Sequence, residues 1–176
     1  MRFVVVLTLA LLSASTAGAK ERSFAVRPFD SSQQLDDFRI AWYSKHLAAM
    51  DEPSLWRTPP NTEIYRVLWL RTFDAPMVFR LIIKPDRSSK LVTKRTNGQG
   101  GYEPGRVVIN KATQIDKEET QILLATLVRI KFWGAQTNET GLGGFDGARW
   151  IIEGVKNGKY HVVDRWAVAN SEGGHY

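Results

Sequence analysis

The stretch from Arg149 to Trp166 reads Arg-Trp-Ile-Ile-Glu-Gly-Val-Lys-Asn-Gly-Lys-Tyr-His-Val-Val-Asp-Arg-Trp, and it decides the fold that the sequence predicts. At its centre, Asn157-Gly158 separates two runs rich in β-branched and aromatic residues. Both central residues of a type I′ turn need positive φ, so this dipeptide predicts a β-hairpin with a two-residue loop. The loop length fixes the register, which gives the predicted pairs Lys156–Lys159, Val155–Tyr160, Gly154–His161, Glu153–Val162, Ile152–Val163, Ile151–Asp164 and Trp150–Arg165.

The rest of the chain adds four predicted strands and two predicted helices. Apolar residues recur at spacings of three and four over 32–50, where Ser31-Ser32 can cap, and over 117–132. Asp116 and Glu119 have the spacing of a capping box for the second helix. Because this helix is strongly apolar, we expect it to be the more buried of the two. Apolar runs bounded by turn residues predict strands at 65–73, 77–84, 91–96 and 106–111.

These elements predict an α+β fold: a single domain with an antiparallel sheet of about six strands, two helices packed on one face, and a type I′ hairpin at the end. The strand at 65–73 is apolar on both faces, which favours a central place in the sheet. The glycine-rich loop at 97–105 joins two strands, so it is not a phosphate-binding loop, and we expect it to be flexible. A separate helical unit at residues 20–60 is the alternative, but one helix cannot bury its own apolar stripe.

Residues 1–19 have the pattern of a secretory signal peptide. Arg2 precedes an apolar run from Phe3 to Leu12, and small residues follow up to Ala19. The apolar run is too short to cross a bilayer, so the pattern predicts cleavage after Ala19 and a mature domain of residues 20–176. We therefore expect a periplasmic or secreted protein with no transmembrane segment in the mature chain. An uncleaved N-terminal anchor is the alternative.

The composition is compatible with export from a bacterial cell. The chain contains no cysteine, and small exported domains of animals are usually dense in disulfides. The net charge is +6, and the surplus of cations is concentrated between Arg66 and Lys111. A positive sheet face suits an anionic glycan, an anionic lipid surface or an acidic protein, whereas nucleic acid is not an expected partner outside the cytoplasm. The alternative is that these cations only keep the sheet soluble and protect its edges.

Two carboxylates on the predicted hairpin are candidate catalytic groups. Glu153 and Asp164 are diagonal neighbours on one face, at about 7 to 8 Å, which is within the general range of paired carboxylates in acid–base catalysis. Burial beside apolar side chains would raise at least one pKa. In the alternative, Arg149 forms a cross-strand ion pair with Asp164, and Glu153 is solvated or caps a loop.

His161, on the opposite face, is the best single candidate for a functional titrating group. It stands across from Gly154, whose missing side chain leaves a notch for the imidazole or for a ligand. The alternative is a half-buried structural histidine whose pKa is lowered by burial and by Lys159. On the same face, Trp150 stands across from Arg165, an arrangement that suits a cation–π contact.

Other signatures of catalysis are missing from the sequence. It has no thiol and no Gly-x-Ser-x-Gly motif. The three histidines, His46, His161 and His175, lack the spacing of metal ligands. We therefore predict no cofactor and no metal, and an enzyme is the less favoured interpretation.

The leading hypothesis is an exported binding module of unknown ligand, such as an inhibitor or an immunity-type protein of the bacterial periplasm. Six tryptophans and abundant arginines support it, because Trp, Tyr and Arg dominate interface hot spots. The same aromatic residues would serve equally well as core. The candidate binding residues are Trp150, His161, Arg165, Trp166 and Tyr102. The second hypothesis is a cell-wall or glycan hydrolase that uses Glu153 and Asp164 with assistance from His161.

Overall fold

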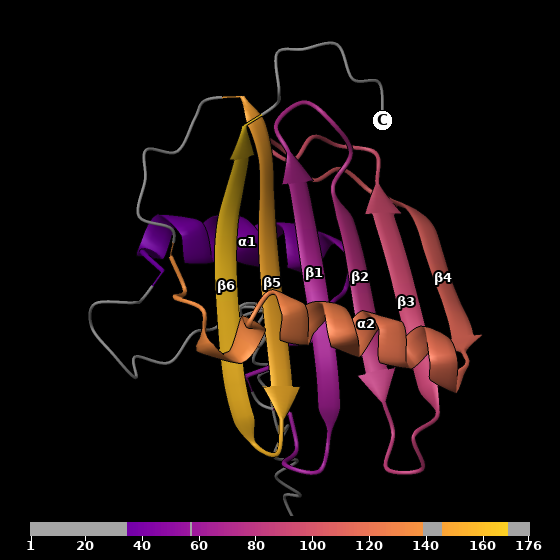
Figure 1. Cartoon of the computed structure of the whole chain (residues 1–176). Coiled ribbons are helices and arrows are strands. Elements are labelled where there is room, and N and C mark those ends of the chain that lie inside the picture. Colours follow the sequence, from indigo (N-terminus) through magenta and orange to yellow (C-terminus); the bar gives the residue numbers. More distant parts are fainter. Residues whose placement is uncertain (1–34, 57, 139–145, 169–176) are drawn as a thin grey trace, which may run out of the picture.

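The computed structural model describes residues 35–56, 58–138 and 146–168, and the predicted signal peptide lies outside them. In chain order the elements are α1 (Asp37–Ala49), β1 (Glu63–Arg71), β2 (Met77–Ile83), β3 (Ser89–Thr96), β4 (Val107–Ile115), α2 (Lys117–Arg129), the 3₁₀ helix η1 (Phe132–Gly134), β5 (Gly147–Lys156) and β6 (Lys159–Val168). The predicted α+β fold is therefore confirmed (Figure 1). None of the helices in these ranges is long and apolar enough to cross a membrane.

The six strands form one antiparallel sheet in the order β4-β3-β2-β1-β5-β6. β1 lies inside the sheet, between β2 and β5, as its two apolar faces predict. The β5–β6 hairpin has the predicted register at every pair from Lys156–Lys159 to Trp150–Arg165. Asn157 and Gly158 have φ angles of 52° and 72°, so both are positive, as a type I′ turn requires.

The two helices cover opposite faces of the sheet, so the expectation that both pack on one face is wrong. Figure 1 shows α1 behind the strands and α2 in front of them. Leu47 of α1 and Leu68 of β1 share one buried cluster, whereas Leu124 of α2 packs against a second cluster that contains Tyr65 of β1. Because successive side chains of a strand point to opposite faces, a strand that is apolar on both sides needs a cover on each side.

Both helices begin at side-chain caps. The carboxylate of Asp36 accepts a hydrogen bond from the backbone N–H of Arg39 at 2.8 Å, so α1 starts later than the prediction at Ser32, which lies outside the described residues. At α2 the predicted capping box is confirmed. Asp116 accepts from the backbone of Glu119 at 2.8 Å, and the Glu119 side chain accepts from the backbone of Asp116 at 3.2 Å.

The prediction that α2 is the more buried helix is wrong. Thr120 is the one buried residue of α2, while Ile122 and Val128 are 61% and 77% exposed. A helix that lies on a sheet buries a single stripe, which here contains Thr120, Leu124 and Leu127. The apolar residues outside that stripe remain in solvent.

A buried ion network ties the segment after α1 to the sheet. Arg66 is fully buried, its Nε donates to Glu153 at 2.7 Å, and its Nη1 lies 3.5 Å from Glu52. Glu52 also pairs with Arg80 at 2.8 Å and with Lys94 at 2.9 Å. Three of the cations that the sequence concentrates in this region are therefore paired with two buried carboxylates, and they contribute little to a charged surface.

Candidate functional site

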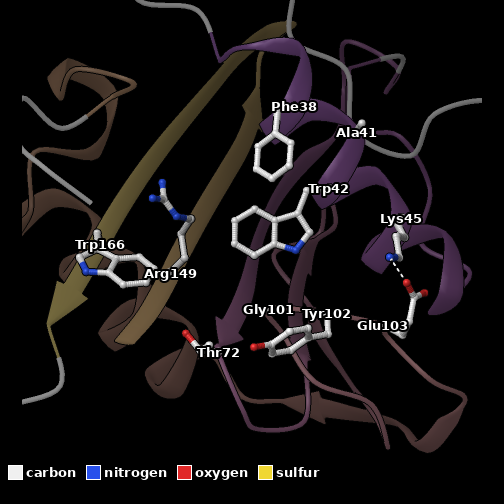
Figure 2. Close-up of a pocket in the computed structure, with 10 residues that line it drawn as sticks. All are labelled: Phe38, Ala41, Trp42, Lys45, Thr72, Gly101, Tyr102, Glu103, Arg149 and Trp166. Atoms are coloured by element: carbon white, nitrogen blue, oxygen red, sulfur yellow. Dashed lines mark hydrogen bonds and ion pairs between the residues drawn. The ribbon is translucent and has the colours of Figure 1, made fainter. Parts of the chain in front are cut away.

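The candidate site is an open groove of about 900 Å³ on the α1 side of the sheet (Figure 2). Its walls come from α1, the segment after β1, the glycine-rich loop at 97–105 and the β5–β6 hairpin. It is lined by Phe38, Ala41, Trp42, Lys45, Thr72, Gly101, Tyr102, Glu103, Arg149 and Trp166. Four aromatic side chains, Phe38, Trp42, Tyr102 and Trp166, therefore line the groove together with four polar or charged ones, and most of its exposed surface is apolar.

Trp42 is the best-anchored aromatic side chain of the groove. Its indole Nε1 donates to the carbonyl oxygen of Gly100 at 3.0 Å and to Nε2 of His46 at 3.1 Å. These two acceptors hold the nitrogen edge against the protein, so the six-membered ring points into the groove (Figure 2). Phe38, one helical turn before Trp42, is 74% exposed, and its ring lies 6.0 Å from the Trp42 ring. The protein thus presents a preorganised aromatic surface.

The glycine-rich loop forms the facing wall, and its backbone is tied to the sheet, unlike the flexible segment that its composition predicts. The N–H of Gly100 donates to the carbonyls of Arg71 at 3.1 Å and Asp74 at 2.9 Å. A Cβ on Gly100 would lie 2.4 Å from the Arg71 carbonyl oxygen, so only glycine permits this close approach. The anchored loop holds Tyr102, which is 55% exposed, beside Phe73 at 6.2 Å between ring centroids.

The charged groups that line the groove are already paired. Lys45 forms an ion pair with Glu103 across one end of the groove (Figure 2). At the other end, Nη1 of Arg149 donates to both carboxylate oxygens of Asp164, at 2.9 and 3.0 Å. The guanidinium carbon of Arg149 also lies 5.1 Å from the ring of Trp166, a cation–π distance. A ligand would therefore meet aromatic rings and neutralised pairs.

Asp164 forms the cross-strand ion pair with Arg149 that the sequence offers as the alternative to a catalytic role. Its side chain is 1% exposed. The hydroxyl of Tyr43 donates to it at 2.7 Å. Burial raises the pKa of Tyr43 well above its usual value, and the negative charge of Asp164 raises it further. Tyr43 is therefore a permanent donor to the carboxylate.

Glu153 sits in a second, separate arrangement of the same kind. It is 1% exposed, so neither solvation nor a loop cap describes it. Arg66 donates to it at 2.7 Å and the Tyr160 hydroxyl at 2.9 Å. Burial raises the pKa of Glu153, and the charge of Arg66 opposes that rise. Since an arginine and a tyrosine engage each of the two carboxylates, the hairpin does not present them as a free acid–base pair.

His161 lies on the α2 side, and its surroundings match those of a structural histidine. Its ring packs against Phe132 at 5.1 Å and Trp133 at 6.1 Å between centroids. The predicted notch above Gly154 is filled, since a Cβ there would lie 2.6 Å from a ring carbon of Phe132. Burial lowers the pKa of His161, and the nearby charge of Lys159 acts in the same direction. A lowered pKa is what the alternative interpretation of His161, a half-buried structural histidine, predicts.

Trp150 and Arg165 do not form the predicted cation–π contact. Trp150 stacks on Trp69, with ring centroids 4.8 Å apart and planes at 19°. The guanidinium of Arg165 donates to the carbonyls of Gln136 at 2.8 Å and Thr137 at 3.3 Å. The structure therefore divides the five candidate binding residues between two faces of the sheet: Trp166 and Tyr102 line the groove, and Trp150, His161 and Arg165 lie on the α2 side.

The α1 residues of the groove are absent from the predicted set, although the sequence carries a signal for them. Phe38, Trp42 and Lys45 follow one another at spacings of four and three, which places them on one helix face. The buried residues Tyr43 and Leu47 define a different face of the same helix. A helix with one apolar stripe against a sheet and a second aromatic stripe beside it offers the second stripe to a ligand.

Metal ligation and sequence comparison do not assign a function to the groove. Within the described ranges, no group of three or more His, Cys, Asp or Glu side chains is placed to hold a metal ion. The chain matches no protein-family model and no curated protein.

Proposed function

We propose that this protein is an exported binding module that takes an apolar segment of a protein partner into its aromatic groove. The observation that carries the proposal is the convergence of four aromatic side chains on one open groove: Phe38, Trp42, Tyr102 and Trp166. Large exposed aromatic side chains that gather at one place mark interaction sites on soluble proteins. Phe38 and Tyr102 are more than half exposed, so a partner can reach them without any rearrangement.

The pairing of the charged side chains supports a protein segment of low charge as the ligand. Lys45 and Arg149 already have carboxylate partners, and a ligand carboxylate would have to compete with them. Apolar and aromatic side chains of a partner would instead gain area against the rings and displace water from them. An inhibitor or immunity-type role needs recognition of this kind and no chemistry.

The engagement of Glu153 and Asp164 supports binding over glycan hydrolysis. A general acid must share its proton with a substrate, and each of these carboxylates is buried against an arginine. Export to the periplasm or the medium is part of the proposal and is supported by the pattern of residues 1–19 in the sequence.

Site-specific photo-crosslinking tests the proposal directly. A benzophenone amino acid is placed at Phe38 in the groove or at Val128 on α2, two positions with 74% and 77% exposure on opposite sides of the sheet. Cells that export the protein are irradiated, and crosslinked products are identified by mass spectrometry. The proposal expects one defined protein from position 38 and not from position 128.

The affinity of that protein for purified variants completes the test. Removal of an aromatic hot-spot residue costs about 2 kcal/mol or more, roughly thirtyfold in Kd. Phe38→Ala should therefore weaken binding to that extent, while Val128→Ala should leave it unchanged. Identical products from both positions, or equal affinities of the two variants, would exclude the groove as the binding site.

A further inference from the structure

The α2 side of the sheet carries a second surface, which the helix leaves open. Figure 1 shows α2 crossing the strands below their middle, so that the upper half of this face has no helix over it. Trp69 of β1 belongs to the open half. It is four residues after Tyr65, which faces η1, and therefore lies on the same face of the strand.

The strand register places a row of six side chains across the open half. Directly paired residues of an antiparallel sheet share a face, and the pairs connect Ile109, Arg95, Met77, Trp69, Trp150 and Arg165 from β4 to β6. All six are exposed or half-buried. The neighbouring row adds Lys111, opposite Thr93. Neither row contains an acidic residue, so the surface is both apolar and positively charged.

The aromatic centre of this row is a closed stack. Trp69 lies between the ring of Trp150 at 4.8 Å and the guanidinium carbon of Arg71 at 4.3 Å. The Trp150 ring and the Arg71 guanidinium therefore both occupy the faces of the Trp69 ring, which leaves less room for a nucleobase to stack on Trp69. The edges of aromatic rings carry partial positive charge, and they add to the attraction of anionic groups.

Cations stand on both sides of the stack. Arg95 and Lys111 form no ion pair with any described residue, and as diagonal neighbours they lie about 7 to 8 Å apart. Arg165 stands at the other end, where its guanidinium donates to backbone carbonyls and keeps its charge. Four strand spacings separate Arg95 from Arg165, roughly 19 Å. Asp74 lies 3.6 Å from Arg71, so Arg71 contributes less to the net charge.

The shape of the surface selects a chain-like ligand. α2 lies on the same face and rises roughly 10 Å above the sheet, so it would hold a planar membrane away from this row. A narrow chain, in contrast, can lie beside α2 across the strands. A peptide in that direction would find no backbone partners, because the inner strands are paired on both sides and peptide addition requires an open edge.

We infer that the open half of the α2 face binds a linear acidic glycan, laid across the strands with its acidic groups against Arg95 and Lys111 at one end and Arg165 at the other. The sugar rings rest on the apolar row between these cations. This site is separate from the aromatic groove and lies on the opposite face of the sheet, so a binding module could hold a protein partner and a glycan at once.

The test uses purified full-length mature protein and oligogalacturonates, with neutral dextran oligomers of equal length as the control ligand. The proposal expects binding to the oligogalacturonate alone, and weaker binding as salt rises. The variant Arg95→Gln/Lys111→Gln should bind about tenfold more weakly. The matched variant Lys84→Gln/Lys90→Gln removes two exposed or half-exposed cations that lie outside both rows, and it should bind like the wild type.

Circular dichroism and thermal melts verify that both variants are folded. Equal loss in the two variants would mean that net charge alone attracts the polyanion, and it would overturn the inference. Tighter binding to anionic lipid vesicles or to single-stranded DNA than to the oligogalacturonate, with the same sensitivity to Arg95→Gln/Lys111→Gln, would also overturn it. Crosslinking at Phe38 concerns the other face, so the two proposals fail or succeed independently.

Discussion

Acidification should destabilise this protein through His46, which lies beneath the aromatic groove. His46 is fully buried, and its Nε2 accepts a hydrogen bond from the indole of Trp42 at 3.1 Å. Burial lowers the pKa of His46 from 6.5 to about 4, and the charge of Lys45 acts in the same direction. The ring is therefore neutral in the folded protein, and a proton on Nε2 would set two donors against each other.

The sign and size of the effect follow from the two pKa values. In the unfolded chain His46 takes up a proton below about pH 6.5, whereas in the folded protein it does so only near pH 4. Its contribution to stability is therefore fully present above pH 6.5 and is lost as the pH falls to 4. The gap between the two values corresponds to about 3 kcal/mol.

Urea unfolding of the wild type and of His46→Gln at pH 7, 5.5 and 4 measures this contribution. Glutamine keeps an acceptor for the Trp42 indole but does not titrate, and all other titrating groups cancel in the difference between the two proteins. The difference in unfolding free energy should move by about 3 kcal/mol in favour of the variant from pH 7 to pH 4. A difference that stays constant over this range would refute the neutral, buried assignment of His46, whatever its value at pH 7.

Two further substitutions test the packing and the buried charges by the same unfolding measurement. Gly154→Ala would force a methyl group against Phe132 and should lower the free energy of unfolding by about 1 to 3 kcal/mol. The control is Gly134→Ala, whose Cβ meets nothing within 4 Å and which should cost less than about 0.5 kcal/mol. Equal costs of the two substitutions would contradict the close contact between Gly154 and Phe132. Arg66→Met leaves the buried Glu153 without its cation and should cost about 3 to 5 kcal/mol, whereas Lys45→Gln, in an exposed pair, should cost less than about 1 kcal/mol. A small cost for Arg66→Met would show that water reaches Glu153.

The hairpin could be predicted from the sequence because its determinants are local. Asn157-Gly158 fixes the loop length, and the loop length fixes every pair out to Trp150–Arg165. The capping box of α2 is local in the same sense, since Asp116 and Glu119 are three residues apart. Such features depend on neighbours in the chain and survive any arrangement of the distant elements.

The placement of the helices could not be predicted in this way. β1 is apolar on both faces. Such a strand is compatible with one helix on each face of the sheet, or with both helices on one face and some other segment covering the opposite face. The choice depends on long-range contacts, such as Leu47 with the Leu68 cluster and Leu124 with the Tyr65 cluster. Periodicity within a helix identifies which side chains need burial, but it does not identify the face that buries them.

The polar residues of the hairpin have structural roles that their sequence pattern does not reveal. A carboxylate on an inner strand loses its water when the sheet is covered, so it must find a cation, and the cation can come from any part of the chain. Glu153 finds Arg66, from a strand far earlier in the sequence. An aromatic residue on a helix does not need a charged partner. Exposure of Phe38 therefore costs the protein little, and a binding partner would remove that cost by covering the ring. The carboxylates Glu153 and Asp164, whose residue type suggests catalysis, therefore have structural roles in this protein. The aromatic residues Phe38 and Trp42, whose residue type suggests a core, line the groove instead. We therefore expect different variants to lose partner binding and stability. Phe38→Ala should weaken partner binding without lowering stability, and Arg66→Met should lower stability.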